Sequence, residues 1–554
     1  MKKNIWLCLA LFLAVVALYG RAIHWSFIGV DDYHFVVSNP FINHGLTMDG
    51  IRGEFSKHFL LGKGDYWAPV SAISHMIDFS IYGFRSGGHH FTNVLIHALN
   101  SILLFLILFT FTKLRWESAA TALIFAVHPM NVEAVCWVVE RKGLLATFFG
   151  LLTIWIYYFY TQKPSWKRML LVMLLFQLGL MAKISILSLP AVLLTLDYWP
   201  LNRLRKSNFP RLFLEKVPLG FLSIFAAMQS FAYFGENSRV VSVENLGILE
   251  RILRGVHSWS FYIKRFFNPE SMSLLLAYPS KLPISWVVSG LLLFAGVLVA
   301  MVVVHKKMPW CLSGMLFYSA LIFPFLGFLQ IGRQWVADRY FYMPAIGLAI
   351  GFVWTISRGF PKLRSNVMGW GVLIFFTMSW VQIGYWKNTA SLFAHAITLH
   401  PEIPTSHHQL ALGLIEQRDF SGARKEFEKT LLLDPTYSFS WNALGELDRS
   451  EGNLEAAIYH FRKGIECNGN SGTAQLNFAK LLIDTKRYSE AEKPLLRAAA
   501  LLPKNPEGFL NLTLVYIRLG RFAEARKVLL QAQSLGASSE VVKEFNEILN
   551  AVHQ

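Results

Sequence analysis

Two adjacent aspartates, Asp31 and Asp32, stand out because a long apolar segment precedes them. They lie in the stretch GVDDYHF, a few residues beyond NIWLCLALFLAVVALYG. A carboxylate beside a hydroxyl group can take its proton while the hydroxyl oxygen attacks a carbon atom. Aspartate also caps turns and short helices, so each residue alone has a structural alternative. The pair therefore predicts either a general base or an acidic turn at this point of the chain.

Charged residues also stand at the ends of later apolar segments. They are Glu140, Arg141, Lys142, Lys183, Arg333, Asp338 and Arg339. An ionisable side chain at membrane depth is costly and indicates a functional site, although each one alone could form a salt bridge or reach lipid phosphates. Cations neutralise a phosphate, and a carboxylate activates a hydroxyl. Together they predict transfer of a sugar from a polyprenyl phosphate to an acceptor.

The composition places much of the chain in a membrane. Its 554 residues are 54% hydrophobic and 16% charged, with a mean hydropathy of +0.40, which exceeds the usual value for a soluble domain. The net charge of +17 would suit nucleic acid, but the lysines and arginines cluster between apolar runs, as in cytoplasmic loops. The four scattered cysteines predict neither a disulfide framework nor a CxxC metal site.

Apolar runs of about 20 residues predict eleven membrane-spanning helices. They lie near residues 5–21, 91–112, 118–136, 143–161, 168–182, 184–200, 217–234, 284–304, 309–330, 340–357 and 367–386. We interpret the first as an uncleaved anchor, since no small-x-small cleavage motif follows it. With Lys2 and Lys3 inside, eleven crossings leave the basic clusters in the cytoplasm and the polar C-terminal region outside. The outward segment 22–90 is long and partly apolar, so we expect helices on the membrane surface there.

The polar C-terminal region contains a repeat of 34 residues, marked by Ala423, Ala457, Ala491 and Ala525. Small alanines let the two helices of a hairpin approach closely, and larger residues fill the contact with the next hairpin. This is the tetratricopeptide pattern, with units at about 404–437, 438–471, 472–505 and 506–539. We therefore predict an all-α chain with a membrane helix bundle over residues 1–386 and a repeat α-solenoid over residues 387–554.

The second span carries a polar face. His90, Asn93, His97 and Asn100 follow one another at spacings of three, four and three residues, which places them along one side of a helix. Two histidines at such a spacing can bind a metal, but polar contacts between membrane helices are the more frequent use of such a face. We favour the helix contact and expect no metal ligand among the site residues.

Five motifs in a fixed order resemble a known family. They are VDDYHFVVSNP, YWAPVSAISHMIDFSIYG followed by HHFTNVLIHALN, FAVHPMNVEAVCWVVERKGLLATFF, MAKISILSLPAVLLTLDYWPL and ADRYFYMPAIGL. With the repeats, they resemble the transmembrane and tetratricopeptide-repeat O-mannosyltransferases and their bacterial homologues, within the GT-C glycosyltransferase superfamily. The resemblance covers essentially the whole chain. It implies a GT-C-type helix bundle and an enzyme that transfers a sugar from a polyprenyl phosphate with inversion at the anomeric carbon.

The resemblance also implies roles for individual residues. Asp31 or Asp32 is the general base, and we prefer Asp31, with Asp32 orienting the acceptor or the sugar hydroxyls. The implied residues for the donor phosphate or sugar are Glu133, Arg141, Lys183 and Arg339. The implied residues for support of the acceptor or the loop are Asp78, His90 and Asn93. Glu133 has a salt bridge to Arg141 as its alternative, and Asp338 with Arg339 has a buried structural pair. No cofactor is required, and a divalent metal is left open.

The implied partners are a polyprenyl-phosphate-linked sugar, membrane lipid and a protein acceptor bound by the repeats, with no nucleic acid. We expect a multi-pass protein of the bacterial inner membrane, with a cytoplasmic N-terminus and periplasmic repeats, although the endoplasmic reticulum would give the same topology. The alternatives are a non-catalytic scaffold for an envelope or secretion complex and an oligosaccharide or O-antigen ligase. Eleven spans exceed the needs of an anchor, and such a ligase places its essential loop late in the membrane region.

Three positions depart from the family pattern. Bacterial relatives often carry arginine at the position of Ala68, an acid at Gly143, and proline or glutamate at Ile184. These replacements leave the identity of the donor open.

Overall fold

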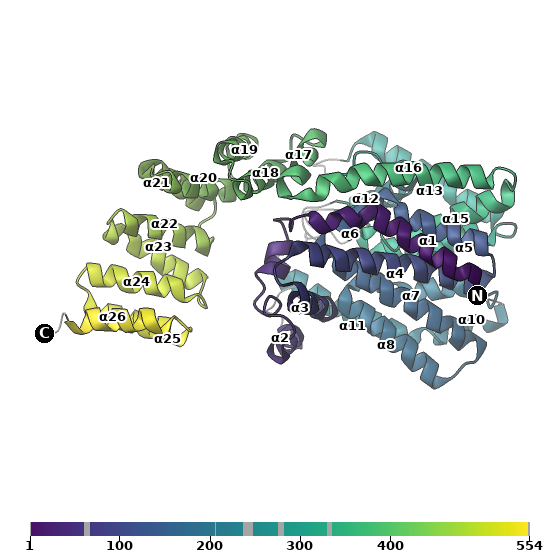
Figure 1. The fold of residues 1–554 in the computed structure, drawn as a ribbon, viewed down its shortest axis with the longest axis horizontal. Helices are drawn as coiled ribbons and strands as arrows, with labels where there is room; N and C mark the ends of the chain where they lie inside the picture. The colour runs from purple at the N-terminus through teal and green to yellow at the C-terminus, as the bar shows by residue number, and fades with distance from the viewer. Residues whose placement is uncertain are drawn as a thin grey trace. The chain divides into compact units, whose positions relative to one another are not determined.

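The computed structural model describes residues 2–59, 67–204, 206–236, 247–274, 282–328 and 335–551. Every regular element within these ranges is helical, so the predicted all-α fold class is confirmed. The chain divides into two compact units, Met1–Leu399 and His400–Gln554 (Figure 1).

The described residues of the first unit form seventeen α-helices. They are α1 (Lys2–Tyr19), α2 (Met48–Phe59), α3 (Pro69–Tyr82), α4 (Ser86–Thr112), α5 (Arg115–Val127), α6 (Val132–Cys136), α7 (Arg141–Gln162), α8 (Trp166–Ala182), α9 (Leu189–Tyr198), α10 (Phe209–Leu214), α11 (Val217–Glu236), α12 (Ile248–Phe267), α13 (Ile284–Val304), α14 (Pro309–Ile322), α15 (Ala345–Gly359), α16 (Arg364–Gly384) and α17 (Thr389–Leu399). Helix α4 contacts α1, α5 and α7, and Figure 1 shows α1, α4 and α7 running side by side. Helix α4 therefore lies at the centre of this unit.

Five helices among the described residues are long and apolar enough to cross a membrane. They cover Asn4–His24, Ser86–Thr112, Val138–Gln162, Ile284–Val304 and Arg364–Tyr385. Helix α5 and the segment Pro129–Cys136 are bent by 56° and make a sixth span if they are counted together. The other expected spans correspond to shorter helices, so the count of eleven stays a prediction.

Large apolar side chains on α13 are exposed, since no described residue of the chain packs over them. Ile284 is 81% exposed, Leu292 69% and Val302 73%. Exposing such a surface to water would cost about 25 cal/mol for each Å² of apolar area, whereas the acyl chains of lipid remove this cost. The chain is therefore a membrane protein.

The segment between the first two expected spans contains α2 and α3, so it forms helices as expected. Pro69 begins α3 at a position where its missing N–H needs no partner. Gly83 ends α3 with a φ of +58°, a conformation that glycine adopts without strain. At the start of α4, a Cβ on Gly87 would lie 2.1 Å from the carbonyl oxygen of Ile23. Only glycine therefore allows α4 to begin so close to the end of the first span.

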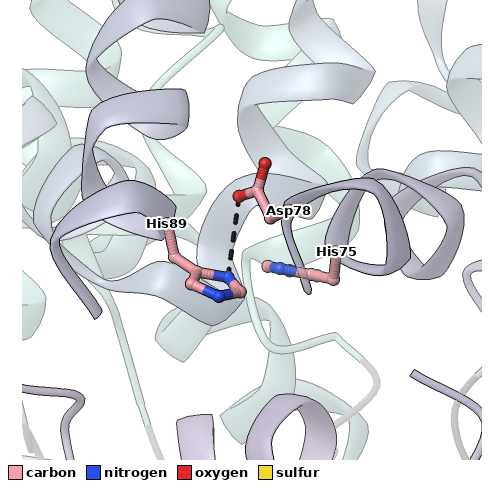
Figure 2. A group of neighbouring side chains, drawn as sticks. All are labelled: His75, Asp78 and His89. Carbon is pink, nitrogen blue, oxygen red and sulfur yellow. Dashed lines mark ion pairs between the residues drawn. The ribbon is translucent and has the colours of Figure 1, made fainter. Parts of the chain in front are cut away.

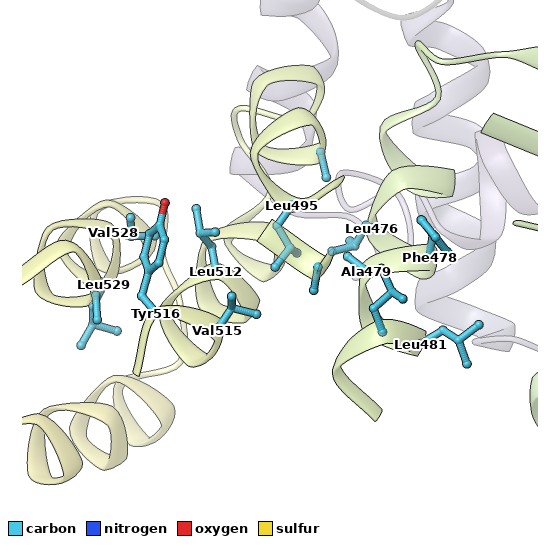
Figure 3. Packing of buried hydrophobic residues seen from close by; sticks show 14 of the residues in the cluster. Leu476, Phe478, Ala479, Leu481, Leu495, Leu512, Val515, Tyr516, Val528 and Leu529 are labelled. Atoms are coloured by element: carbon cyan, nitrogen blue, oxygen red, sulfur yellow. The ribbon is translucent and has the colours of Figure 1, made fainter. Parts of the chain in front are cut away.

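The second unit consists of helical hairpins, one in each predicted repeat. The pairs are α18 (Pro404–Glu416) with α19 (Phe420–Leu433), α20 (Ser438–Ser450) with α21 (Leu454–Cys467), α22 (Gly472–Asp484) with α23 (Tyr488–Leu501), and α24 (Pro506–Arg518) with α25 (Phe522–Ser534), followed by α26 (Ser539–Ala551). The four alanines that mark the repeat are fully buried. Figure 3 shows how Leu476, Leu495 and Leu512 continue one apolar core from hairpin to hairpin. The repeats are thus held together by neighbour contacts along the solenoid.

Candidate functional site

Asp32 is fully buried and both of its carboxylate oxygens accept main-chain hydrogen bonds. One oxygen accepts from the N–H of Ile28 at 2.9 Å and the other from the N–H of Val139 at 2.8 Å. Val139 belongs to the 3₁₀ turn Val138–Glu140, which directly precedes α7. Asp32 therefore ties residues 25–47, which we call the first loop, to the start of α7.

The environment of Asp32 disfavours its charge. Burial raises the pKa of Asp32 to about 7, although the two main-chain N–H groups favour the charged form. The negative charge of Asp31 adds to this rise, and Lys142 opposes it. Asp32 therefore exchanges its proton near neutral pH.

Asp31 is the more accessible member of the pair, since its side chain is only partly buried. Its carbonyl oxygen accepts the N–H of Phe35 at 2.9 Å. Nearby, the N–H of Gly29 donates to the hydroxyl of Thr389 on α17 at 2.8 Å. The backbone that carries Asp31 is thus fixed from both sides.

Arg141, the first residue of α7, is fully enclosed by protein groups that accept hydrogen bonds. Its Nη1 lies 2.5 Å from Asp78 Oδ2 and 3.3 Å from the carbonyl oxygen of Ser74. Its Nε donates to Asn93 Oδ1 at 2.8 Å, and its Nη2 donates to the carbonyl of His89 at 2.7 Å. We call these residues the Asp78 cluster. The cluster joins α3, α4 and α7.

A second group of charges gathers beside the first, and we call it the Glu140 cluster. Lys183 Nζ lies 2.7 Å from one oxygen of Glu140, and Lys142 Nζ lies 3.5 Å from the other. Arg339 Nε is also 3.5 Å from Glu140, while its Nη1 pairs with Glu133. Three cations thus surround two carboxylates, contributed by four separate segments of the chain.

Within the described part of the chain, the ammonium group of Lys183 keeps hydrogen-bonding capacity. Its side chain is 8% exposed, and Glu140 takes one of the three N–H bonds of its ammonium group. Burial lowers the pKa of Lys183 to about 8, although Glu140 opposes the change. A Cβ on Gly143 would lie 3.7 Å from Lys183 Nζ, so glycine at this position leaves room beside the ammonium group.

Asp338 and Arg339 do not pair with each other. Asp338 Oδ1 lies 3.4 Å from Arg265 of α12, whereas Arg339 turns to Glu133 and Glu140. The expected alternative of a salt bridge between Glu133 and Arg141 is likewise not formed, because Arg141 pairs with Asp78.

A small cavity of about 70 Å³ lies between the first loop, α3 and the start of α7. Its polar lining residues are Asn39, Glu54, Ser71, His75 and Lys142, and Ala68 and Val139 also line it. Burial and the charge of Arg141 hold the pKa of His75 well below its ordinary value, so its imidazole is neutral. The cavity is therefore lined both by Val139, whose N–H binds Asp32, and by polar side chains of α3.

His90 and Asn93 of α4 are both fully buried. The His90 ring lies 3.3 Å from the carbonyl oxygen of Ser26, in the first loop. Besides accepting from Arg141, Asn93 donates to the carbonyl of Trp137 at 3.1 Å. One face of α4 thus holds both the first loop and the turn before α7.

His97 and Asn100 continue this face, and both bond the Tyr342 hydroxyl, at 2.6 and 3.3 Å. His97 also contacts the carbonyl oxygen of Ala126 at 3.0 Å. All four residues of the polar face thus contact other segments of the first unit, and neither His90 nor His97 belongs to a cluster of metal ligands among the described residues.

The resemblance implied no individual role for Glu140 and Lys142, although both belong to the charged motif that contains Arg141. The 3₁₀ turn ends and α7 begins within these three residues, so their side chains diverge. Arg141 enters one cluster, and Glu140 and Lys142 enter the other. The mixed charges of these three consecutive residues could have indicated that more than Arg141 belongs to the site.

The comparisons with known proteins concern both units. A model described as Tetratricopeptide repeat matches residues 476–540. The chain is 22% identical over 430 residues to a protein O-mannosyl-transferase of Caenorhabditis elegans, covering 74% of this chain and 60% of that protein. It is 25% identical over 501 residues to protein O-mannosyl-transferase TMTC1 of Homo sapiens, covering 78% and 55%.

Among solved structures, YrrB, a TPR protein with an unusual peptide-binding site, matches 28% of this chain and 81% of its own at 16% identity, with a TM-score of 0.26. The chain spans little more than half the length of the two O-mannosyl-transferases above. The resemblance found in the sequence is confirmed, because the chain is similar to named protein O-mannosyl-transferases over about three quarters of its length.

Proposed function

We propose that the chain is an inverting membrane glycosyltransferase, which transfers mannose or another hexose from a polyprenyl phosphate to a serine or threonine of an exported protein. The names of its relatives support the protein O-glycosylation part of this proposal. The buried charges of the first unit support the chemistry. An inner-membrane location, with the N-terminus in the cytoplasm and the repeats in the periplasm, belongs to the same proposal.

The reaction needs one base and one group that stabilises the leaving phosphate. The acceptor hydroxyl oxygen forms a bond to the anomeric carbon, and the bond from that carbon to the phosphate oxygen breaks. The phosphate leaves with the electron pair, and Asp31 takes the hydroxyl proton. The products are the glycosylated protein and polyprenyl phosphate.

A single observation carries this assignment. The N–H of Val139 donates to Asp32 and so holds the first loop against Val139. The next residue, Glu140, binds Lys183. This contact thereby fixes the half-buried carboxylate of Asp31 with respect to the Glu140 cluster. Asp32, with both oxygens occupied, serves in this proposal as the positioning residue for Asp31.

The donor phosphate binds at the Glu140 cluster. Lys183 has unused N–H bonds, and Arg339 and Glu133 hold each other in place beside it. Charge-assisted hydrogen bonds of this kind stabilise the negative charge that grows on the leaving group. Arg141, which the resemblance assigned to the donor, instead has a structural role in this proposal because protein acceptors surround its guanidinium group.

The support residues hold the loop that carries the base. Asp78 anchors Arg141, Asn93 contacts both Arg141 and the turn before α7, and His90 reaches the first loop at Ser26. Loss of any of these contacts would shift Asp31 with respect to Lys183. A displacement of about 1 Å can cost a factor of about 100 in rate.

The repeats bind the protein acceptor. A groove of about 740 Å³ lies between α21, α22 and α23, with Phe478 and Leu496 among its apolar residues. Arg462, Lys493 and Arg497 also line it, whereas its carboxylate Glu466 is paired with Lys463 at 2.8 Å. The excess of positive charge fits an extended acceptor segment that carries acidic residues.

The test of the transfer reaction uses purified chain, a polyprenyl-phosphate sugar and a protein acceptor. Asp31→Asn should lower the rate of glycoprotein formation by about 100-fold or more, since a general base contributes at least this much. Asp49→Asn is the matched control, because the Asp49 side chain is 98% exposed and it should keep the wild-type rate. If the wild-type chain transfers no sugar while deletion of the repeats still abolishes the cellular phenotype, the scaffold alternative holds.

The acceptor groove has its own test. Replacing Lys493 and Arg497 by glutamate should slow transfer to a folded acceptor with an acidic segment by about tenfold, and leave transfer to a short peptide unchanged. Lys504→Glu, which is also exposed but lies outside the groove, is the control. If the double variant transferred sugar to both acceptors at the wild-type rate, the groove would not be the site that binds the acceptor.

A further inference from the structure

Three buried residues of α3 and α4 direct possible metal ligands toward one another. They are His75, Asp78 and His89, which are 3%, 3% and 0% exposed (Figure 2). One ligand atom from each lies within 4.8 Å of the other two. No other group of three such residues at this spacing occurs in the described part of the chain.

The hydrogen bonds around His89 prepare it to be a ligand. Its Nε2 lies 3.0 Å from the carbonyl oxygen of Gly83. A carbonyl can only accept, so Nε2 carries the proton and Nδ1 keeps its lone pair. This Nδ1 has no hydrogen-bond partner in the described ranges and faces Asp78 Oδ2 at 3.6 Å. A hydrogen bond to the far nitrogen is the usual way in which a protein orients a metal-binding histidine.

His75 is buried, and neither of its ring nitrogens has a hydrogen bond to a described residue. Buried polar atoms of this kind are rare in folded proteins and require an explanation, such as an ion or an ordered water molecule. The ring of His75 stacks on that of His89, with centroids 6.3 Å apart. His75 also lines the cavity of about 70 Å³ described above.

Asp78 offers the anionic ligand. Its Oδ1 accepts from the hydroxyl of Thr92 at 2.8 Å, which orients the carboxylate. Its Oδ2 is shared with Arg141, but a carboxylate oxygen has two lone pairs and can face two cations. The charge of Arg141 weakens binding of a dication, and therefore this is a site of moderate affinity.

We propose that His75, Asp78 and His89 bind a zinc-like divalent cation, with an open coordination position that faces the cavity. Two imidazoles and one carboxylate suit Zn²⁺ or Co²⁺ better than Mg²⁺ or Ca²⁺, which need oxygen ligands. Binding draws the ligand atoms together to about 3.4 Å, the spacing around tetrahedral Zn²⁺. The open position binds water or a hydroxyl group. Asp78 also supports the proposed transferase site, but the test of the metal site does not depend on sugar transfer, because it measures metal alone.

The test uses the full-length chain in detergent, purified without a histidine tag and stripped with a chelator. After equilibration with Zn²⁺ and removal of the excess, elemental analysis should find about one more equivalent of zinc in the wild type than in His75→Ala. His44→Ala, at an exposed histidine, should match the wild type. Equal zinc contents in wild type and His75→Ala would overturn the proposal and favour a buried water molecule.

A second variant covers the case in which His75→Ala does not fold. His75→Cys keeps a ligand at the position, and with Co²⁺ it should give a new thiolate-to-metal charge-transfer band that the wild type lacks. A Co²⁺ spectrum without this band, from a folded variant, would place the metal elsewhere and contradict the site.

Discussion

The Asp78 cluster and the Glu140 cluster begin at neighbouring residues and differ in what their cations contact. Arg141 is enclosed by four protein acceptors and is fully buried. Lys183 in the Glu140 cluster is also buried, but within the described residues it gives one N–H, to Glu140. Consecutive helix residues point about 100° apart, so one short motif supplies both clusters. This difference is the reason that the proposal above gives donor binding to Lys183 and a structural role to Arg141.

The largest expected effect is on stability, at the Asp78 cluster. Arg141→Met should lower the free energy of unfolding by about 3–5 kcal/mol, because Asp78 is then left buried and unpaired. Detergent-based thermal unfolding measures this loss, and Arg364→Met, at an exposed arginine, should leave stability unchanged. The double variant Arg141→Met, Asp78→Leu should recover part of the loss.

The same variant can also contradict the proposed difference between the Asp78 cluster and the Glu140 cluster. If Arg141→Met folds with wild-type stability and instead loses affinity for the donor, Arg141 belongs to the donor site and the two clusters do not differ as described.

A smaller effect concerns the pH dependence of donor affinity at the Glu140 cluster. The pKa of Lys183 is about 8, so the ammonium group is charged below this pH and neutral above it. Affinity for the polyprenyl-phosphate donor should therefore fall by up to about tenfold for each pH unit above 8. Lys183→Arg keeps its charge over this range and should show no such fall. A titration in which both proteins lose affinity in parallel would exclude Lys183 as the cause.

The smallest expected effect is the pH dependence of stability that comes from Asp32. Its folded pKa of about 7 lies above the ordinary value of 3.8, so the folded chain keeps a proton that the unfolded chain releases. This contribution to stability is complete below pH 3.8 and is lost as the pH rises through about 7. Between about pH 5 and pH 8, the melting temperature of the wild type should fall by a few degrees more than that of Asp32→Asn. Identical slopes would show that Asp32 does not titrate in this range.

The fold was largely predictable from the sequence because its signals are periodic. The apolar runs and the spacing of 34 residues each repeat many times, and the helix pairs fall within the expected units. The polar face of α4 was also predictable, since a helix fixes the direction of His90 and Asn93 from their spacing.

The partners of individual charges were not predictable, because they depend on contacts between distant segments. Asp338 pairs with Arg265, which no spacing rule connects to it. Likewise, His75 and His89 meet only because the turn at Gly83 folds α3 back against α4. Sequence patterns identify which residues are unusual, and the packing of helices decides which of them meet.

The central claim is that Asp31 takes the proton while Lys183 binds the donor phosphate, and steady-state kinetics with a polyprenyl-phosphate sugar tests it most directly. Asp31→Asn should lower kcat by about 100-fold or more with little change in donor affinity, and Lys183→Ala should weaken donor affinity by about tenfold or more. If both folded variants transfer the sugar with wild-type kcat and donor affinity, the account is contradicted.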